Sequence, residues 1–168
     1  MLYFLLSILL IGVDQMVKVW VRKAIVLGAS VPFLPHVLEL TYVQNTGAAF
    51  SFLAGSDLTW LLAIVSLIAT MVIALALRKD FFPGPWGRLS LSLLLAGAAG
   101  NLIDRAALGY VTDMFKTVFI DFPVFNVADI CVVCGGVLMI VYVLFFYDKD
   151  KDAEAPAPDA PEDSHDQP

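Results

Sequence analysis

Residues 58–77 read LTWLLAIVSLIATMVIALAL, twenty consecutive residues without a charged side chain. A helix that crosses the ~30 Å hydrocarbon core of a bilayer needs about 20 apolar residues at a rise of ~1.5 Å per residue. Three further apolar stretches of similar length lie at about residues 2–21, 89–108 and 127–147. The sequence therefore predicts an α-helical membrane protein with four transmembrane helices.

Composition and charge support this class. Hydrophobic residues make up 60% of the 168 residues, whereas soluble domains are nearer ~45–50%. Residues 1–147 carry eight acidic and eight basic side chains, so the net charge of −6 comes from residues 148–168. This Pro-, Ala- and Asp-rich end has no apolar periodicity, which predicts one four-helix domain followed by a disordered acidic tail. No basic patch indicates a nucleic-acid partner.

The segments between the apolar stretches differ in character. Residues 78–88 contain Pro83, Gly84 and Pro85 and predict a plain turn. The longer segments, about 22–57 and 109–126, each contain a run rich in β-branched and aromatic residues, at 37–43 and 111–120. Because both long segments lie on the same side of a four-span bundle, we expect these runs to pair in a small sheet against the bilayer.

Acidic residues occur at unusual places in this apolar chain. Asp14, Asp104 and Asp129 lie in or at the edge of apolar stretches, and Asp113 follows shortly after the third stretch. A carboxylate at membrane depth costs about 2.5–3.5 kcal/mol on insertion scales, so each is a candidate functional residue. Four spans place all four aspartates near one face of the bilayer, which predicts a polar site there.

Several polar residues have a simple structural interpretation. Asp14 and Lys18 lie four residues apart, which predicts an ion pair within the first helix. Asn126 is a candidate N-cap of the fourth helix. The third helix ends with three residues predicted to share one face, in which the arginine holds carboxylates or carbonyls: Asn101, Asp104 and Arg105.

Asp113 and Asp129 are harder to explain by structure alone. No basic residue lies one helical turn from Asp129, and Lys116 is the one base close to Asp113 in the sequence. Two carboxylates held together at low dielectric share a proton, because both cannot ionise. One then takes a proton from water while the other donates to a carbonyl oxygen, which is the chemistry of an aspartic peptidase.

Other chemistries find less support in the sequence. There is no H-E-x-x-H zinc motif and no plausible Ser/His pair, so we expect neither a metal nor an organic cofactor. Cys131 and Cys134 form a C-x-x-C pair in an apolar helix, where filling of space is favoured over metal or redox work. A proton-coupled small membrane transporter is the alternative function, since intramembrane aspartates can relay protons. A scaffold would not need Asp113 and Asp129 together.

The polar residues fall within blocks that resemble those of a known family. The blocks are Asp14-Gln15 with Lys18, Asn45-Thr46-Gly47-Ala48-Ala49-Phe50-Ser51, Gly100-Asn101-Leu102-Ile103-Asp104-Arg105, Gly109-Tyr110-Val111-Thr112-Asp113, and Phe122-Pro123-Val124-Phe125-Asn126-Val127-Ala128-Asp129. In this order they resemble the lipoprotein signal peptidases (signal peptidase II), the aspartic peptidases of the bacterial inner membrane. The similarity extends from about Asp14 to Val143.

The resemblance implies both a fold and an activity. It implies four transmembrane helices with cytoplasmic termini and a small periplasmic β-rich cradle, in agreement with a slight bias of loop charges. It implies cleavage of diacylglyceryl-modified prolipoproteins just before the lipidated cysteine, with the active site toward the periplasm. The catalytic pair is expected to be Asp113 and Asp129. Substrate-binding or site-supporting residues are expected to be Asp14, Lys18, Asn45, Asn101, Asp104, Arg105 and Asn126. Membrane lipids are expected partners, and globomycin-like peptide antibiotics are expected inhibitors.

Overall fold

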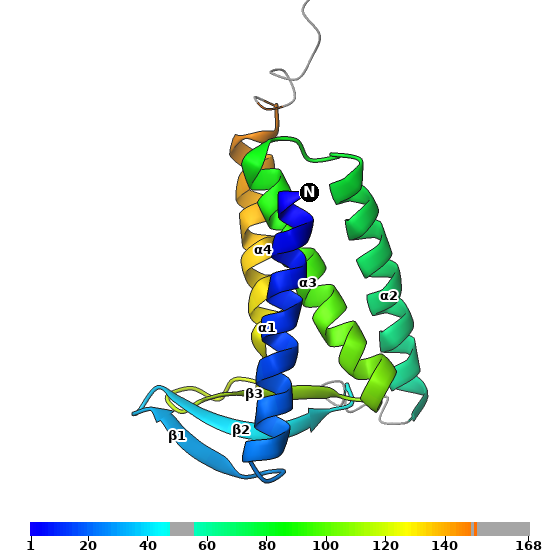
Figure 1. Cartoon of the computed structure of the whole chain (residues 1–168). Coiled ribbons are helices and arrows are strands. Elements are labelled where there is room, and N and C mark those ends of the chain that lie inside the picture. Colours follow the sequence, from blue (N-terminus) through cyan, green and yellow to red (C-terminus); the bar gives the residue numbers. More distant parts are fainter. Residues whose placement is uncertain (48–55, 149, 151–168) are drawn as a thin grey trace, which may run out of the picture.

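The computed structural model describes residues 1–47, 56–148 and 150. Four helices stand side by side, and a small sheet lies across one end of the bundle (Figure 1). The helices are α1 (Leu2–Ala24), α2 (Ser56–Arg78), α3 (Gly84–Leu108) and α4 (Val127–Phe145), and the strands are β1 (Ser30–Leu34), β2 (Leu38–Asn45) and β3 (Val111–Thr117). All four helices are long and apolar enough to cross a membrane, which confirms the expected fold class. Most of the expected acidic tail lies outside the described residues.

Helix α3 is the centre of the bundle and packs against each of the other three helices. Its contact with α4 is close because small residues face each other there. A Cβ atom at Gly97 would lie 2.5 Å from both the carbonyl oxygen of Ala128 and Cγ2 of Val132. Small residues at such crossings let helix backbones approach, which replaces the hydrophobic driving force that lipid does not supply.

The turn between α2 and α3 is shorter than predicted. Helix α3 begins at Gly84, inside the predicted 78–88 turn and five residues before the predicted start at 89. Pro83 is the N-cap and a proline occupies the first helical turn, where its missing N–H leaves no intrahelical bond unmade. Arg88 pairs with Asp80 across this turn. The prolines thus begin the helix rather than extending the loop.

The sheet is antiparallel, with the strand order β1-β2-β3. Leu38 pairs with Thr117 and Val43 with Asp113, which confirms the expected pairing of the two long segments, although β3 ends at Thr117 rather than at 120. Between Leu40 and Val43 the register shifts by one residue, and such a bulge bends the strand. The edge strand β1 was not predicted, because it contains Pro32 and prolines occur in sheets mainly at edges.

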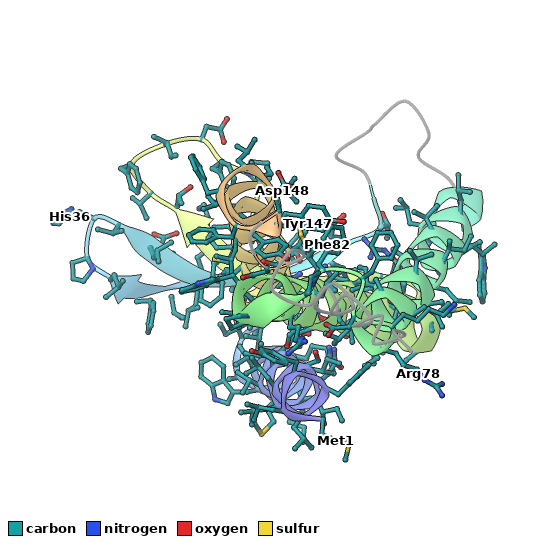
Figure 2. All side chains as sticks on the ribbon, turned by 90° about the horizontal axis from the view of Figure 1, so that it is seen from above. Met1, His36, Arg78, Phe82, Tyr147 and Asp148 are labelled. Atoms are coloured by element: carbon teal, nitrogen blue, oxygen red, sulfur yellow. The ribbon has the colours of Figure 1, made fainter. Side chains whose placement is uncertain are left out.

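Apolar packing fixes the sheet under the end of α1. One buried cluster contains Val21 and Ile25 of the α1 end, Leu40 and Tyr42 of β2, and Met114 of β3. Beyond this cluster the β1–β2 hairpin extends past the helices, with His36 at its outer tip (Figure 2). One end of the sheet is therefore anchored to the bundle, and the other end projects to one side of the bundle.

We predict that Gly97→Ala destabilises the protein by about 1–3 kcal/mol, because the added methyl group overpacks the α3–α4 contact. Gly136→Ala is the matched control, since a Cβ atom at Gly136 meets nothing within 4 Å. The control should be neutral or gain about 0.5–1 kcal/mol from helix propensity. Thermal unfolding in detergent measures both, and equal midpoints for the two variants would contradict this account of the packing.

Candidate active site

A buried ion cluster joins α1 to α3 at the sheet end of the bundle. Nζ of Lys18 lies 2.9 Å from Oδ2 of Asp14 and 3.6 Å from Oδ2 of Asp104. These three side chains are at most 1% exposed. Gln15 Nε2 donates to Oδ2 of Asp14 at 3.1 Å and to the carbonyl oxygen of Gly100 at 3.0 Å. The predicted Asp14–Lys18 ion pair is confirmed, and it is part of a network between two helices.

Both carboxylates of this cluster also accept a backbone N–H from another element. Oδ1 of Asp14 accepts the N–H of Ala128 at 2.9 Å, in the first turn of α4. Oδ2 of Asp104 accepts the N–H of Thr112 at 2.8 Å, in β3. Ala128 and Thr112 each directly precede one of the two predicted catalytic aspartates. The ion cluster therefore holds the backbone beside both of them.

The structure brings Asp113 and Asp129 together around Asn126. Asp113 is 2% exposed, and its Oδ1 accepts Nδ2 of Asn126 at 2.6 Å while its Oδ2 accepts Nδ2 of Asn45 at 2.9 Å. Oδ2 of Asp129 accepts the backbone N–H of Asn126 at 3.0 Å, and its Oδ1 accepts Nδ2 of Asn101 at 2.8 Å. Each of the four carboxylate oxygens thus has one amide N–H donor, and one asparagine donates to both aspartates.

Local sequence explains two of these asparagines. Asn126 is the N-cap of α4, as predicted, and its Oδ1 accepts the N–H of Asp129 at 2.9 Å in a capping box. Oδ1 of Asn45 accepts the N–H of Gly47 at 2.8 Å, which turns its amide nitrogen toward Asp113. The rest of the 45–51 block, residues 48–51, lies outside the described residues. Local turns and caps therefore aim both amides at the aspartates.

Burial raises the pKa of Asp113 to about 6, with the negative charge of Asp129 adding to the rise. The hydrogen bonds from Asn126 and Asn45 act in the opposite direction, because they stabilise the ionised carboxylate. A carboxyl group with this pKa changes its protonation state close to neutral pH, as a group that gives and takes protons must.

Within the described part of the chain, Arg105 has a hydrogen bond to α2. Its Nη1 donates to Oγ of Ser66 in α2 at 3.3 Å, whereas Asp104 faces Lys18 of α1. Consecutive residues on an α-helix point about 100° apart, so Asp104 and Arg105 face different neighbouring helices. That Arg105 holds carboxylates or carbonyls stays a prediction.

An open cavity of about 430 Å³ lies beside Asp129. Most of its walls are apolar, and Asn45 and Asp129 contribute polar groups; the other lining residues are Phe122, Pro123, Val124, Phe125, Ile130, Val133 and Cys134. Cys131 is buried, as the space-filling interpretation expected, but Cys134 is exposed and forms part of this wall. The site therefore combines two carboxylates with an apolar surface.

Sequence reasoning missed several contacts of the site. Gln15 lies in a recognised block but had no assigned role, and Arg22 donates through Nη1 to Oγ1 of Thr112 at 2.8 Å. The spacing by four residues predicts that Asp14, Lys18 and Arg22 form one stripe along the first helix, but it does not identify Thr112 as the partner of Arg22. Among the described residues, no three His, Cys, Asp or Glu side chains are grouped to hold a metal ion.

Comparisons with known proteins agree on one family. Residues 6–145 match the family model described as signal peptidase (SPase) II. The lipoprotein signal peptidase of Clostridioides difficile is 46% identical over 151 residues, which cover 89% of this chain and 99% of that protein. The lipoprotein signal peptidase of Enterococcus faecalis is 43% identical, with coverage of 84% and 87%. A solved structure described as a bacterial membrane enzyme is 31% identical, with a TM-score of 0.76 and 93% coverage of both chains.

We predict that Asp113 makes stability depend on pH between about pH 4 and pH 7. Its folded pKa of about 6 lies above the ordinary value of 3.8, so its contribution to stability is present at low pH and is lost as the pH rises. Relative to Asp113→Asn, the wild type should lose about 2–3 kcal/mol over this range. Unfolding midpoints of both proteins measure the difference, with Asp121→Asn as an exposed control that should follow the wild type. A difference that stays constant or grows with pH would contradict the raised pKa.

Proposed function

The chain belongs to the signal peptidase II family, and we propose that it removes signal peptides from prolipoproteins as an aspartic endopeptidase. The observation that carries this proposal is the contact of Asn126 with both Asp113 and Asp129. The buried carboxylates of Asp14 and Asp104 are paired with Lys18, whereas those of Asp113 and Asp129 accept hydrogen bonds from amides. The alternative of a proton-coupled transporter is not supported by the comparisons.

The proposed reaction uses the two aspartates on one water molecule. Asp129 takes a proton from water while the water oxygen bonds to the scissile carbonyl carbon, and the proton of Asp113 moves to the carbonyl oxygen. In the second step the C–N bond breaks, the leaving nitrogen takes the proton from Asp129, and a hydroxyl group returns its proton to Asp113. The raised pKa of Asp113 favours it as the member that holds the proton at rest.

The substrate is proposed to carry a diacylglyceryl group, with cleavage just before the lipidated cysteine. The cavity beside Asp129 supports this, because apolar walls such as Ile130 and Val133 lie directly next to the reacting carboxylate. A lipid-anchored substrate keeps its scissile bond near the membrane surface, where the sheet end of the bundle provides both carboxylates and access for water. We expect globomycin-like peptide antibiotics to inhibit by occupying the same site.

Membrane lipids are proposed to contact the projecting hairpin. Phe33 and Val37 of the hairpin are exposed, and so are Val118 and Phe119 after β3. The N–H of Val118 donates to the carbonyl oxygen of Val37, so the β1–β2 turn and the residues after β3 lie together at one apolar end of the sheet. An apolar end of the sheet that projects beside a membrane-spanning bundle can be buried in the interfacial region of the bilayer.

We predict that Asp113→Asn and Asp129→Asn each lower kcat/KM on a lipidated prolipoprotein by at least roughly 10³-fold, because each removes an acid–base group. The double variant should be little worse than either single variant, since the two groups act as one unit. Asp121→Asn, an exposed change between them in the sequence, should retain full cleavage. Near wild-type cleavage by a folded Asp113→Asn protein would show that the aspartic mechanism is wrong.

We also propose that the site faces the periplasm, or outer face of the cytoplasmic membrane, with both termini in the cytoplasm. The N-terminus, the α2–α3 turn and the end of α4 lie at the opposite end of the bundle from the sheet (Figure 1). Reporter fusions at Pro85 and Pro168 should therefore read as cytoplasmic, and a reporter inserted at Pro35 should read as external. Different sides for Pro85 and Pro168 would be inconsistent with four spans.

A further inference from the structure

Lys18 makes a contact that its ion pair does not explain. An ammonium group has three donors in all. One points to Oδ2 of Asp14, and another lies 3.0 Å from the side-chain oxygen of Asn101, with the carbonyl oxygen of Gly100 at 3.5 Å. Lys18 is 0% exposed, so water does not compete for these donors. Its charge is thus held beside an amide that belongs to the active site.

The amide of Asn101 has donors on one side and an acceptor on the other. Its Oδ1 accepts from Nζ of Lys18 and from Nδ2 of Asn126 at 3.2 Å, while its Nδ2 donates to Oδ1 of Asp129 at 2.8 Å. A reversed amide would turn its NH₂ group toward two other donors and its oxygen toward a carboxylate. The reversed orientation is therefore unfavourable, and the N–H donor of Lys18 contributes to that penalty.

We propose that Lys18 is a positioning residue for catalysis: acting through Asn101, it keeps an N–H donor directed at Oδ1 of Asp129. This inference rests on the proposed function, in which Asp129 takes a proton from water. The donor holds the carboxylate in one rotamer and leaves its remaining lone pairs for the water. Lys18 itself touches neither Asp129 nor the cavity, so its effect should be on turnover rather than on substrate binding.

A purely structural role for Lys18 makes a different prediction. As a link between Asp14 and Asp104, Lys18 would affect stability, and the enzyme that remains folded would turn over normally. A positioning role requires the hydrogen bond to Asn101 in particular. The two roles are separated by a variant that keeps an N–H donor without the charge, and by removal of the amide through which Lys18 acts.

The test uses an Asp14→Asn background, because removing Lys18 alone takes the partner from two buried carboxylates and is strongly destabilising. In this background the remaining carboxylate, that of Asp104, keeps Nη1 of Arg22 at 3.8 Å. In this background Lys18→Met, which has no donor, should lower kcat by about tenfold to a hundredfold with little change in KM, since a misplaced catalytic group costs on this order. Lys18→Gln, which keeps an N–H, should retain most of the turnover. Lys23→Met, an exposed lysine of the same helix, is the control for loss of charge and should be unaffected.

A double-mutant cycle with Asn101→Ala tests the route of the effect. If Lys18 acts through this amide, adding Lys18→Met to Asn101→Ala should cost no more than about a further twofold in kcat. Losses that multiply, or equal losses for Lys18→Met and Lys18→Gln, would overturn the proposal. Asp113→Asn is assayed in parallel: if it is inactive, such results overturn only the role of Lys18, whereas an active Asp113→Asn enzyme overturns the proposed function itself.

Discussion

Two buried carboxylates at the edge of the apolar bundle, those of Asp14 and Asp104, must be neutralised, and the arrangement of the sheet end depends on how this is done. Each carboxylate costs a few kcal/mol at membrane depth unless it is paired (about 2.5–3.5 kcal/mol). Lys18 lies between them, and each accepts one further N–H, from Ala128 in α4 and from Thr112 in β3. The hydrogen bonds to these two carboxylates therefore bring the start of α4 and the start of β3 together beside α3.

The active-site geometry follows from this convergence. Asp113 follows Thr112 and Asp129 follows Ala128 in the sequence. Because the ion cluster binds the N–H groups of Thr112 and Ala128, it fixes the backbone position of both proposed catalytic aspartates. Asn126 completes the arrangement, because an N-cap side chain must fold back over the first turn of its helix. In that position its amide nitrogen reaches Asp113, and a local helix cap becomes the link between two distant parts of the chain.

Much of this architecture could be predicted from the sequence, and the misses share a physical cause. Apolar length predicted the four helices, β-branched runs predicted two strands, and spacing by four residues predicted the Asp14–Lys18 pair, because each signal is local. The direction of Arg105 and the bond from Asn126 to Asp113 depend on which element lies opposite, and local periodicity does not contain that information. The prolines misled twice, at β1 and at the start of α3, since proline marks edges and beginnings as well as loops.

The two pairs of aspartates in this small region have different hydrogen-bond and charge partners. This difference distinguishes the structural pair, Asp14 and Asp104, from the proposed catalytic pair, Asp113 and Asp129. Asp14 and Asp104 lie beside an ammonium group, and each accepts a backbone N–H from another element. Asp113 and Asp129 are held by amide N–H groups, which orient a carboxylate with less cost to its proton affinity than a full positive charge. The groups that donate hydrogen bonds to Asp113 and Asp129 are neutral amides, and the amide of Asn101 separates the ammonium group of Lys18 from Asp129. The buried polar groups are therefore paired, and a proton can still move to and from the two proposed catalytic carboxyl groups.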